Sequence, residues 1–242
     1  VVVTDIDEAG LAQVAEELGA YAVCSDAATA AGVERVVTAA RDHLGAIDVF
    51  FANAGVEAGS GLETSDDDWA RSLDVNLMAH VRAARLLVPE WLERSGGRFV
   101  VTASAAGLLT MIGSAPYSVT KHAAVAFAEW LSITYGDRGV VVQAVCPQGV
   151  QTRMYEEAGP LKELLARDRV VTPDELADLV WESMHDDRFL VLPHPEVAGY
   201  YAQRATDTDA WLAGMRRLQA RFDRHTTERR PTDRHPTKQE RN

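Results

Sequence analysis

Residues 98–146 read RFVVTASAAGLLTMIGSAPYSVTKHAAVAFAEWLSITYGDRGVVVQAVC, and this stretch decides the fold. Its composition predicts an apolar strand over 98–103, a helix over 115–135 and a second apolar strand over 140–145. Strands that alternate with long helices form a parallel sheet with right-handed crossovers. The segment is therefore one unit of a parallel sheet.

The same alternation of strands and helices continues on both sides of this segment. Further strands are predicted over 1–4, 21–24, 47–52 and 189–192, and the nearly all-apolar third of these is typical of a strand covered on both faces. Helices are predicted over 8–18, 28–44, from Ser65 to about 93, from Thr172, and around 211–222. Ser65 followed by Asp68 is a helix-capping pattern, and Pro173 fits the first position of a helix. The expected fold class is α/β, a doubly wound, Rossmann-type parallel sheet in a single domain over 1–222.

The last part of the sequence has a different composition. From 223 to 242 the chain is polar, rich in Arg, Thr and Pro, and almost without apolar residues. Such a segment cannot bury enough apolar surface to fold, so it predicts a disordered C-terminal tail.

Composition excludes several classes of protein. The chain has 242 residues, 47% of them hydrophobic, and a formal net charge of −12, whereas a nucleic-acid binder needs a basic footprint. No apolar run reaches the roughly 18 residues of a membrane helix, and the first residues of the given sequence do not have the pattern of a signal peptide. Cys24 and Cys146 lie in apolar, strand-like runs, which indicates buried thiols and a cytoplasmic protein. The histidines show no metal-ligand spacing, so no metal site is expected.

The strongest chemical signal is Ser104 followed by Tyr117 and Lys121. Tyr117 and Lys121 stand four residues apart on a predicted helix and share a face, and Ser104 ends a predicted strand. A nearby ammonium lowers the pKa of a phenol from about 10, so that it can serve as general acid or base. A hydroxyl can hydrogen-bond a substrate oxygen on which charge develops. A Tyr–Lys pair alone is usually a pair on a helix surface without chemical function. The presence of Ser104 at a strand end favours a catalytic group instead.

Two weaker signals agree with this one. Asn53-Ala54-Gly55 follows an apolar strand as a turn of small residues, which lets the backbone approach a ligand closely, although an ordinary turn has the same composition. Asn76 lies inside a predicted helix, where asparagine is a mediocre helix former, so its presence calls for a reason.

Together these residues resemble the short-chain dehydrogenase/reductase (SDR) family over about 1–192. The elements occur in the family's order at successive strand ends. They are Asp5, Asp26, Ala52-Asn53-Ala54-Gly55, Asn76, Ser104, Tyr117 with Lys121, and Pro147-Gln148-Gly149-Val150-Gln151-Thr152.

The resemblance implies a role for each catalytic residue. Tyr117 would donate or accept the proton, and Ser104 would orient the substrate oxygen. Lys121 would hold the nicotinamide ribose hydroxyls and lower the pKa of Tyr117. Asn76 would hold a water that continues a proton relay from Lys121.

The resemblance also implies a nicotinamide dinucleotide cofactor. Asp26 and Ala27 would contact its adenine, and Asn53, Ala54 and Gly55 would pass along the adenosine. The nicotinamide loop would comprise Pro147, Gly149, Val150 and Thr152, of which the last two would contact the carboxamide.

Asp5 bears on the choice of cofactor. An acidic residue at this strand end accepts hydrogen bonds from a ribose 2′-hydroxyl and repels a 2′-phosphate, and no Lys or Arg occurs among residues 1–10. The sequence therefore favours NAD over NADP. The alternative is that Asp5 or Asp7 merely caps the next helix.

The chain departs from the family pattern at its start. The family begins with a strand and a glycine-rich turn, whereas this sequence begins inside the family's second strand. The missing strand is central, so a sheet without it would have two unpaired interior edges. We therefore expect further residues before Val1. Smaller departures are Ala52 in place of an asparagine and Gln148 in place of a glycine.

The substrate is the least determined property. The pocket is expected from 105–116, 154–165 and the region near 193–201, with an apolar lining that includes Leu108, Leu109, Met111, Ile112, Met154 and Tyr155. This lining indicates a small, fairly apolar alcohol or ketone. The expected protein is an NAD-dependent oxidoreductase that interconverts an alcohol and a ketone or aldehyde, and by resemblance a homodimer or homotetramer. The alternatives are an NADP-dependent carbonyl reductase and a non-catalytic scaffold with the same fold.

Overall fold

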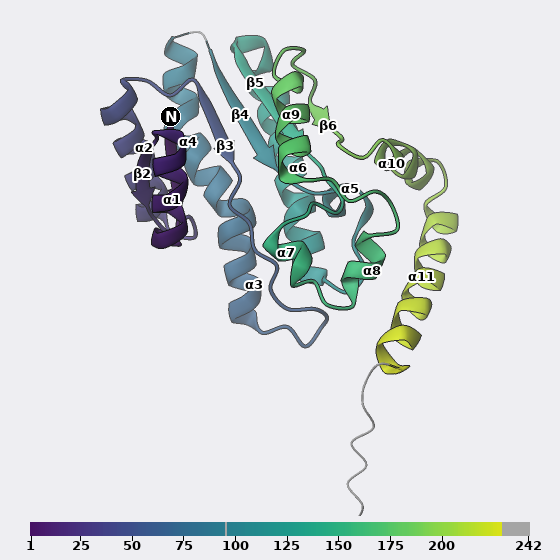
Figure 1. The fold of residues 1–242 in the computed structure, drawn as a ribbon. Helices are drawn as coiled ribbons and strands as arrows, with labels where there is room; N and C mark the ends of the chain where they lie inside the picture. Colours follow the sequence, from purple (N-terminus) through teal and green to yellow (C-terminus); the bar gives the residue numbers. More distant parts are fainter. Residues whose placement is uncertain (95, 229–242) are drawn as a thin grey trace, which may run out of the picture.

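The computed structural model describes residues 1–94 and 96–228 and confirms the α/β class (Figure 1). All strands are parallel and form two sheets. The smaller sheet pairs β1 (Val2–Asp5) with β2 (Tyr21–Cys24). The larger sheet has the order β3 (Val49–Ala52), β4 (Gly97–Thr102), β5 (Val140–Val145) and β6 (Leu190–Val191).

The two sheets do not hydrogen-bond to each other within the described residues, so β1 and β3 each present an unpaired edge. A break at this position of the sheet was expected from the sequence. The expectation that the third strand is covered on both faces was wrong. Phe50 and Ala52 pack in the core, but Phe51 is 48% exposed, because β3 ends its sheet and is packed on one face only.

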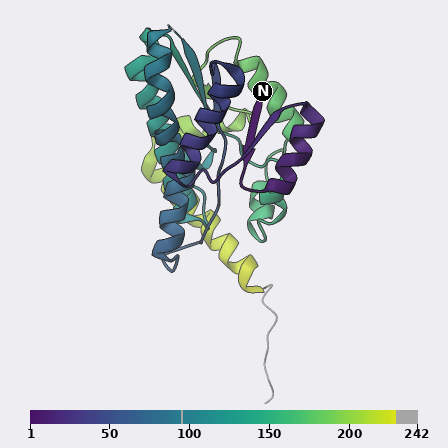
Figure 2. The ribbon, with the colours of Figure 1, turned by 90° about the vertical axis from the view of Figure 1, so that its left-hand side faces the viewer.

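Helices cover the larger sheet on both sides, as a doubly wound fold requires (Figure 2). On one face Phe99 and Val101 pack in a core with α2 (Ala30–Leu44), α4 (Ala79–Glu93) and α6 (Ala115–Tyr135). On the other face Val100 and Val145 pack against α9 (Pro173–Ser183). Successive residues of β4 thus enter opposite layers, as the alternation of side chains along a strand dictates.

The long helix predicted from Ser65 begins where expected but is not continuous. The Ser65 hydroxyl accepts the Asp68 N–H at 3.1 Å, which caps α3 (Asp66–Leu73). A π-helical turn, Asp74–Met78, then separates α3 from α4. Asn76 lies in this π turn, so the structure gives a reason for an asparagine at a position where the sequence predicted a regular helix. The helix start expected at Thr172 is confirmed, with Pro173 in the first turn of α9, and Thr172 and Glu175 form a capping box there.

The C-terminal part contains two helices beyond the sheet, α10 (Glu196–Thr206) and α11 (Thr208–Glu228) (Figure 1). The prediction of a tail from 223 was therefore wrong for 223–228, which complete α11. Gln219 donates a hydrogen bond to Asp223 at 2.7 Å along that helix, so polar side chains extend it. Residues 229–242 lie outside the described part of the chain.

The remaining elements are short or lie beside the smaller sheet. They are α1 (Glu8–Leu18), α5 (Ala106–Leu109), a 3₁₀ turn (Gly136–Arg138), α7 (Arg153–Glu156) and α8 (Leu161–Leu165). Cys146 is buried, but Cys24 is exposed on β2, the edge strand of the smaller sheet, so the prediction of two buried thiols holds for Cys146 alone. None of the described helices is long and apolar enough to cross a membrane.

Candidate active site

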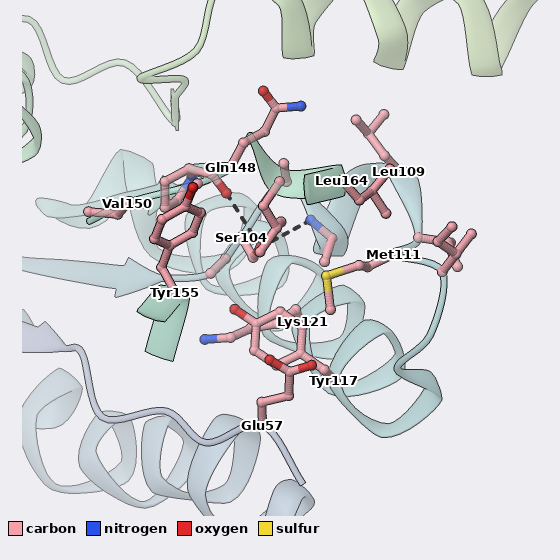
Figure 3. A pocket seen from close by; sticks show the side chains of 18 of the residues that line it. Glu57, Ser104, Leu109, Met111, Tyr117, Lys121, Gln148, Val150, Tyr155 and Leu164 are labelled. Carbon is pink, nitrogen blue, oxygen red and sulfur yellow. Dashed lines mark hydrogen bonds between the residues drawn. The ribbon is translucent and has the colours of Figure 1, made fainter. Parts of the chain in front are cut away.

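A pocket of about 1070 Å³ opens where β3, β4 and β5 end, at the edge where a doubly wound sheet binds ligands (Figure 3). Most residues predicted for the site line this one pocket. They are Asp5, Asn53, Ala54, Gly55, Ser104, Tyr117, Lys121, Pro147, Gly149, Val150 and Thr152. Residues from strand ends far apart in the sequence therefore meet, as the parallel sheet predicts.

Three of the predicted residues do not line the pocket. Asp26 and Ala27 follow β2 in the loop before α2, where the Asp26 carboxylate accepts the Ala28 N–H at 2.9 Å. Asn76 is fully buried behind the pocket wall.

The central group consists of Ser104, Tyr117 and Lys121 (Figure 3). Tyr117 and Lys121 lie one turn apart on α6, and the Lys121 ammonium is 5.6 Å from the centre of the Tyr117 ring. Ser104 follows β4, and its hydroxyl accepts the Ala106 N–H at 3.1 Å. A hydrogen bond also links Ser104 to the Tyr117 hydroxyl and favours the phenolate. The three side chains form one connected arrangement.

The pKa of Tyr117 is set mainly by its burial. Burial raises it above the ordinary value, the hydrogen bond from Ser104 acts in the opposite direction, and the negative charge of Glu57 raises it further. The expected lowering by Lys121 is therefore wrong for this structure. The reason is the direction of the lysine, whose ammonium donates to the Thr102 carbonyl oxygen at 2.8 Å.

The pKa of Lys121 is also shifted from its ordinary value. Its side chain is buried, and burial lowers its pKa from 10.5 to about 8. An ammonium has three N–H donors, and the hydrogen bond to Thr102 uses one of them. Since Lys121 lines the pocket, the others are available to a bound ligand.

Asn76 joins three parts of the site. Its amide nitrogen donates to the Val56 carbonyl oxygen and to the Thr120 hydroxyl, both at 2.9 Å. Its amide oxygen accepts the Val56 N–H at 2.8 Å. The π turn thus aims one asparagine at both the loop after β3 and helix α6, and fixes their relative positions.

Replacement of Asn76 by Ala is expected to lower the free energy of unfolding by about 2–3 kcal/mol, because it removes three hydrogen bonds and leaves both backbone polar groups of the partly buried Val56 without the asparagine. Urea denaturation measures the change. Asn53→Ala, at an exposed asparagine, is the matched control and is expected to stay within about 0.5 kcal/mol of the wild type. Equal stability of the two variants would contradict this account of Asn76.

The two N-terminal aspartates have different roles. Asp7 caps α1 and accepts the Gly10 N–H at 3.3 Å, so the capping alternative is right for Asp7. Asp5 accepts the Asp7 N–H at 2.9 Å but also lines the pocket, at the end of β1.

The expected substrate lining is largely present, with one correction and one omission. Leu109, Met111, Ile112, Met154 and Tyr155 line the pocket. Leu108 does not, because it is 2% exposed on the inner side of α5 and belongs to the core.

The expected lining near 193–201 is confirmed by Tyr200 on α10, but the sequence did not lead us to expect Gln203 or the wall that α11 supplies. Tyr200, Gln203, Trp211, Met215 and Leu218 line the pocket. The spacing of Trp211, Met215 and Leu218 is that of one helix face, and this signal could have predicted the wall. The reasoning also missed Glu57, for which the sequence offered no signal beyond an acidic residue near the turn at Asn53–Gly55.

Among the described residues no group of three or more His, Cys, Asp or Glu side chains could hold a metal ion. The fold and the Ser, Tyr and Lys arrangement together define a dinucleotide-dependent type of oxidoreductase site.

Comparison with known proteins agrees with that class. The family model for short chain dehydrogenase matches residues 1–162. The chain is 34% identical over 222 residues to a 1-deoxy-11-beta-hydroxypentalenate dehydrogenase of Streptomyces avermitilis, covering 88% of this chain and 82% of the relative. It is 35% identical over 174 residues to a meso-2,3-butanediol dehydrogenase of Serratia marcescens, covering 69% of each chain.

A solved structure agrees as well. An SDR from Burkholderia phymatum in complex with NAD is similar to this chain with a TM-score of 0.77 and 29% identity, covering 86% of this chain and 85% of the other. The chain therefore belongs to the short-chain dehydrogenase/reductase family. It is an oxidoreductase of the kind that acts on hydroxyl groups.

Proposed function

We propose that this protein is an NAD-dependent oxidoreductase that interconverts an alcohol and a ketone or aldehyde, with Tyr117 as general acid and base. The observation that supports this most strongly is the position of Ser104, Tyr117 and Lys121 in one pocket with Asp5 and the loop 147–152. An enzyme of this kind needs a proton-transfer group and a dinucleotide site side by side, and these residues supply both.

The residues fit a ribose-bearing cofactor. The Lys121 ammonium faces the pocket with donors free for ribose hydroxyls. Gly55 keeps the approach open, since a Cβ at this position would lie 3.3 Å from the ammonium nitrogen and 3.5 Å from the Asn76 amide oxygen. The bound nicotinamide would supply or accept the hydride.

The protein's own side chains would carry out the proton transfer. Ser104 would donate a hydrogen bond to the substrate oxygen, and the Tyr117 hydroxyl would give that oxygen a proton in reduction or take it in oxidation. Lys121 would hold the ribose of the cofactor next to Tyr117, since its ammonium lies 5.6 Å from the centre of the tyrosine ring. Asn76 would hold the water that continues the relay.

The named activities of relatives support an alcohol as the reduced substrate. The names 1-deoxy-11-beta-hydroxypentalenate and meso-2,3-butanediol both describe hydroxyl compounds. The apolar lining favours a small, fairly apolar alcohol or ketone in this chain.

The preference for NAD depends on Asp5. Its carboxylate would accept a hydrogen bond from the adenosine 2′-hydroxyl and repel a 2′-phosphate. Asp26, Ala27 and Asn53 to Gly55 would pass along the adenosine, and Pro147, Gly149, Val150 and Thr152 would hold the nicotinamide end.

A fluorescence titration of the full-length protein with NADH and then NADPH tests the cofactor assignment. We expect NADH to bind at least about tenfold more tightly, which corresponds to about 1.4 kcal/mol. Asp5→Ser should reduce this ratio without abolishing NADH binding. Tighter binding of NADPH by the wild type would overturn the assignment of Asp5 and favour a carbonyl reductase. Binding of neither would favour the scaffold alternative.

The proposal also covers the cellular location and the oligomeric state of the protein. We place the enzyme in the cytoplasm, because its thiols are free and no described helix crosses a membrane. We also expect a homodimer or homotetramer.

A further inference from the structure

Glu57 is a pocket residue to which the proton transfer described above assigns no role. It lies in the loop after β3, lines the pocket and is half-buried. Figure 3 shows its carboxylate beside Tyr117, and its negative charge is close enough to raise the pKa of that tyrosine. An acidic group thus stands next to the proposed proton donor.

The loop holds Glu57 in place at both ends. The neighbouring residue Val56 is bound through both of its backbone polar groups by the Asn76 side chain. Three residues further on, the Ser60 carbonyl oxygen accepts the Ala115 N–H at 2.9 Å, at the start of α6. The position of Glu57 relative to Tyr117 is therefore set by the same residues that build the active site.

The carboxylate has no cationic partner. No Lys, Arg or His of the described residues forms an ion pair with Glu57. Burial raises its pKa, and a hydrogen bond from the Ser114 hydroxyl acts in the opposite direction. A carboxylate has two oxygens that can accept several hydrogen bonds, so the bond from Ser114 leaves acceptor capacity for a donor on a ligand in the pocket.

We propose that Glu57 is a specificity-determining residue that accepts a hydrogen bond from a hydroxyl on the carbon next to the reacting carbon. The substrate class is then a vicinal diol and its α-hydroxy ketone. With the reacting oxygen held by Ser104 and Tyr117, a hydroxyl on the adjacent carbon would face Glu57, whose carboxylate lies beside Tyr117 in the same pocket (Figure 3). This inference rests on the proposed function, since it assumes that Tyr117 faces the reacting oxygen.

The test compares two ketones that differ by one hydroxyl, 3-hydroxybutan-2-one and butan-2-one, reduced by the full-length protein with NADH and with NADPH. Three variants are compared with the wild type. Glu57→Leu removes the acceptor, Glu57→Gln retains an acceptor oxygen, and Glu34→Leu is a control at an exposed glutamate of α2 outside the pocket. Thermal unfolding of each variant establishes that it is folded.

We expect Glu57→Leu to lower kcat/KM for the hydroxy ketone by about 10–100-fold, mainly through KM, because a site built for a hydroxyl loses its acceptor. The value for butan-2-one should change by less than about threefold. Glu57→Gln should retain more of the preference than Glu57→Leu, and Glu34→Leu should retain all of it.

Equal losses for both ketones in Glu57→Leu would overturn the inference and leave the proposed function intact. So would an equal collapse of the preference in the Gln and Leu variants, since a hydroxyl needs only an acceptor oxygen. If the wild type reduces neither ketone with either cofactor, the proposed function fails, and the inference fails with it.

Discussion

Replacement of Tyr117 by Phe is expected to lower kcat by about 10²–10⁴-fold, because the only group lost is the hydroxyl that transfers the proton. The ring remains, so the packing of α6 and the cation–ring contact with Lys121 are retained. Cofactor affinity should stay within a few fold of the wild type. Steady-state reduction of a ketone with NADH, together with an NADH titration, measures both quantities.

The matched control is Tyr155→Phe, which removes a hydroxyl from another tyrosine of the same pocket. Tyr155 lies on α7, and its ring centre is 5.0 Å from the Lys162 ammonium. We expect its kcat to change by less than about tenfold, since it takes no part in the proton transfer. A loss of the same size in both variants would contradict the assignment of Tyr117.

Replacement of Lys121 by Met is expected to abolish most turnover and to stabilise the fold at neutral pH. The buried ammonium has a pKa of about 8 in the folded chain against 10.5 as its ordinary value. The unfolded chain therefore binds more protons between these two values, and wild-type stability rises with pH across the window from about 8 to 10.5. Below that window the buried charge lowers the free energy of unfolding by up to about 3 kcal/mol. The Met variant removes this cost. It also loses the hydrogen bond to Thr102, so its net gain in stability is smaller.

Urea denaturation of the cofactor-free protein at pH 7 and at pH 9.5 measures this effect. The Met variant should be more stable than the wild type by about 1–3 kcal/mol at pH 7. The difference should shrink at pH 9.5, where most of the lysine in the folded wild type has lost its proton. A variant that is less stable than the wild type at pH 7 would show that the charge of Lys121 stabilises the fold.

The architecture could be predicted from the sequence because short apolar runs, typical of buried parallel strands, alternate along the chain with longer segments of helical periodicity. The run 140–145 is apolar except for Gln143 and forms β5, an interior strand of the larger sheet, and the helix predicted over 115–135 has the bounds of α6. Parallel strands bring their carboxyl ends to one edge, so Ser104 and Tyr117, on separate elements, were expected to meet and do.

Other features depend on contacts that no local pattern encodes. The π turn at Asn76 follows from three hydrogen bonds to Val56 and Thr120, which lie 20 and 44 residues away in sequence. The pKa of Tyr117 depends on its burial and on Glu57, neither of which the Tyr–Lys spacing reveals. The exposure of Phe51 depends on which face of β3 a helix covers, a property of the tertiary fold rather than of the strand.

The most direct test of the central claim is the transfer of hydrogen from substrate to cofactor. The full-length protein is incubated with NAD and with butane-2,3-diol or butan-2-ol deuterated at the carbinol carbons, and the reduced dinucleotide is analysed by mass spectrometry. Our account predicts that deuterium appears in the reduced NAD from at least one of the two alcohols, and that Tyr117→Phe suppresses its appearance by about 10²-fold or more. Labelled product that forms equally fast in the Tyr117→Phe variant, or no labelled product from either alcohol, would contradict it.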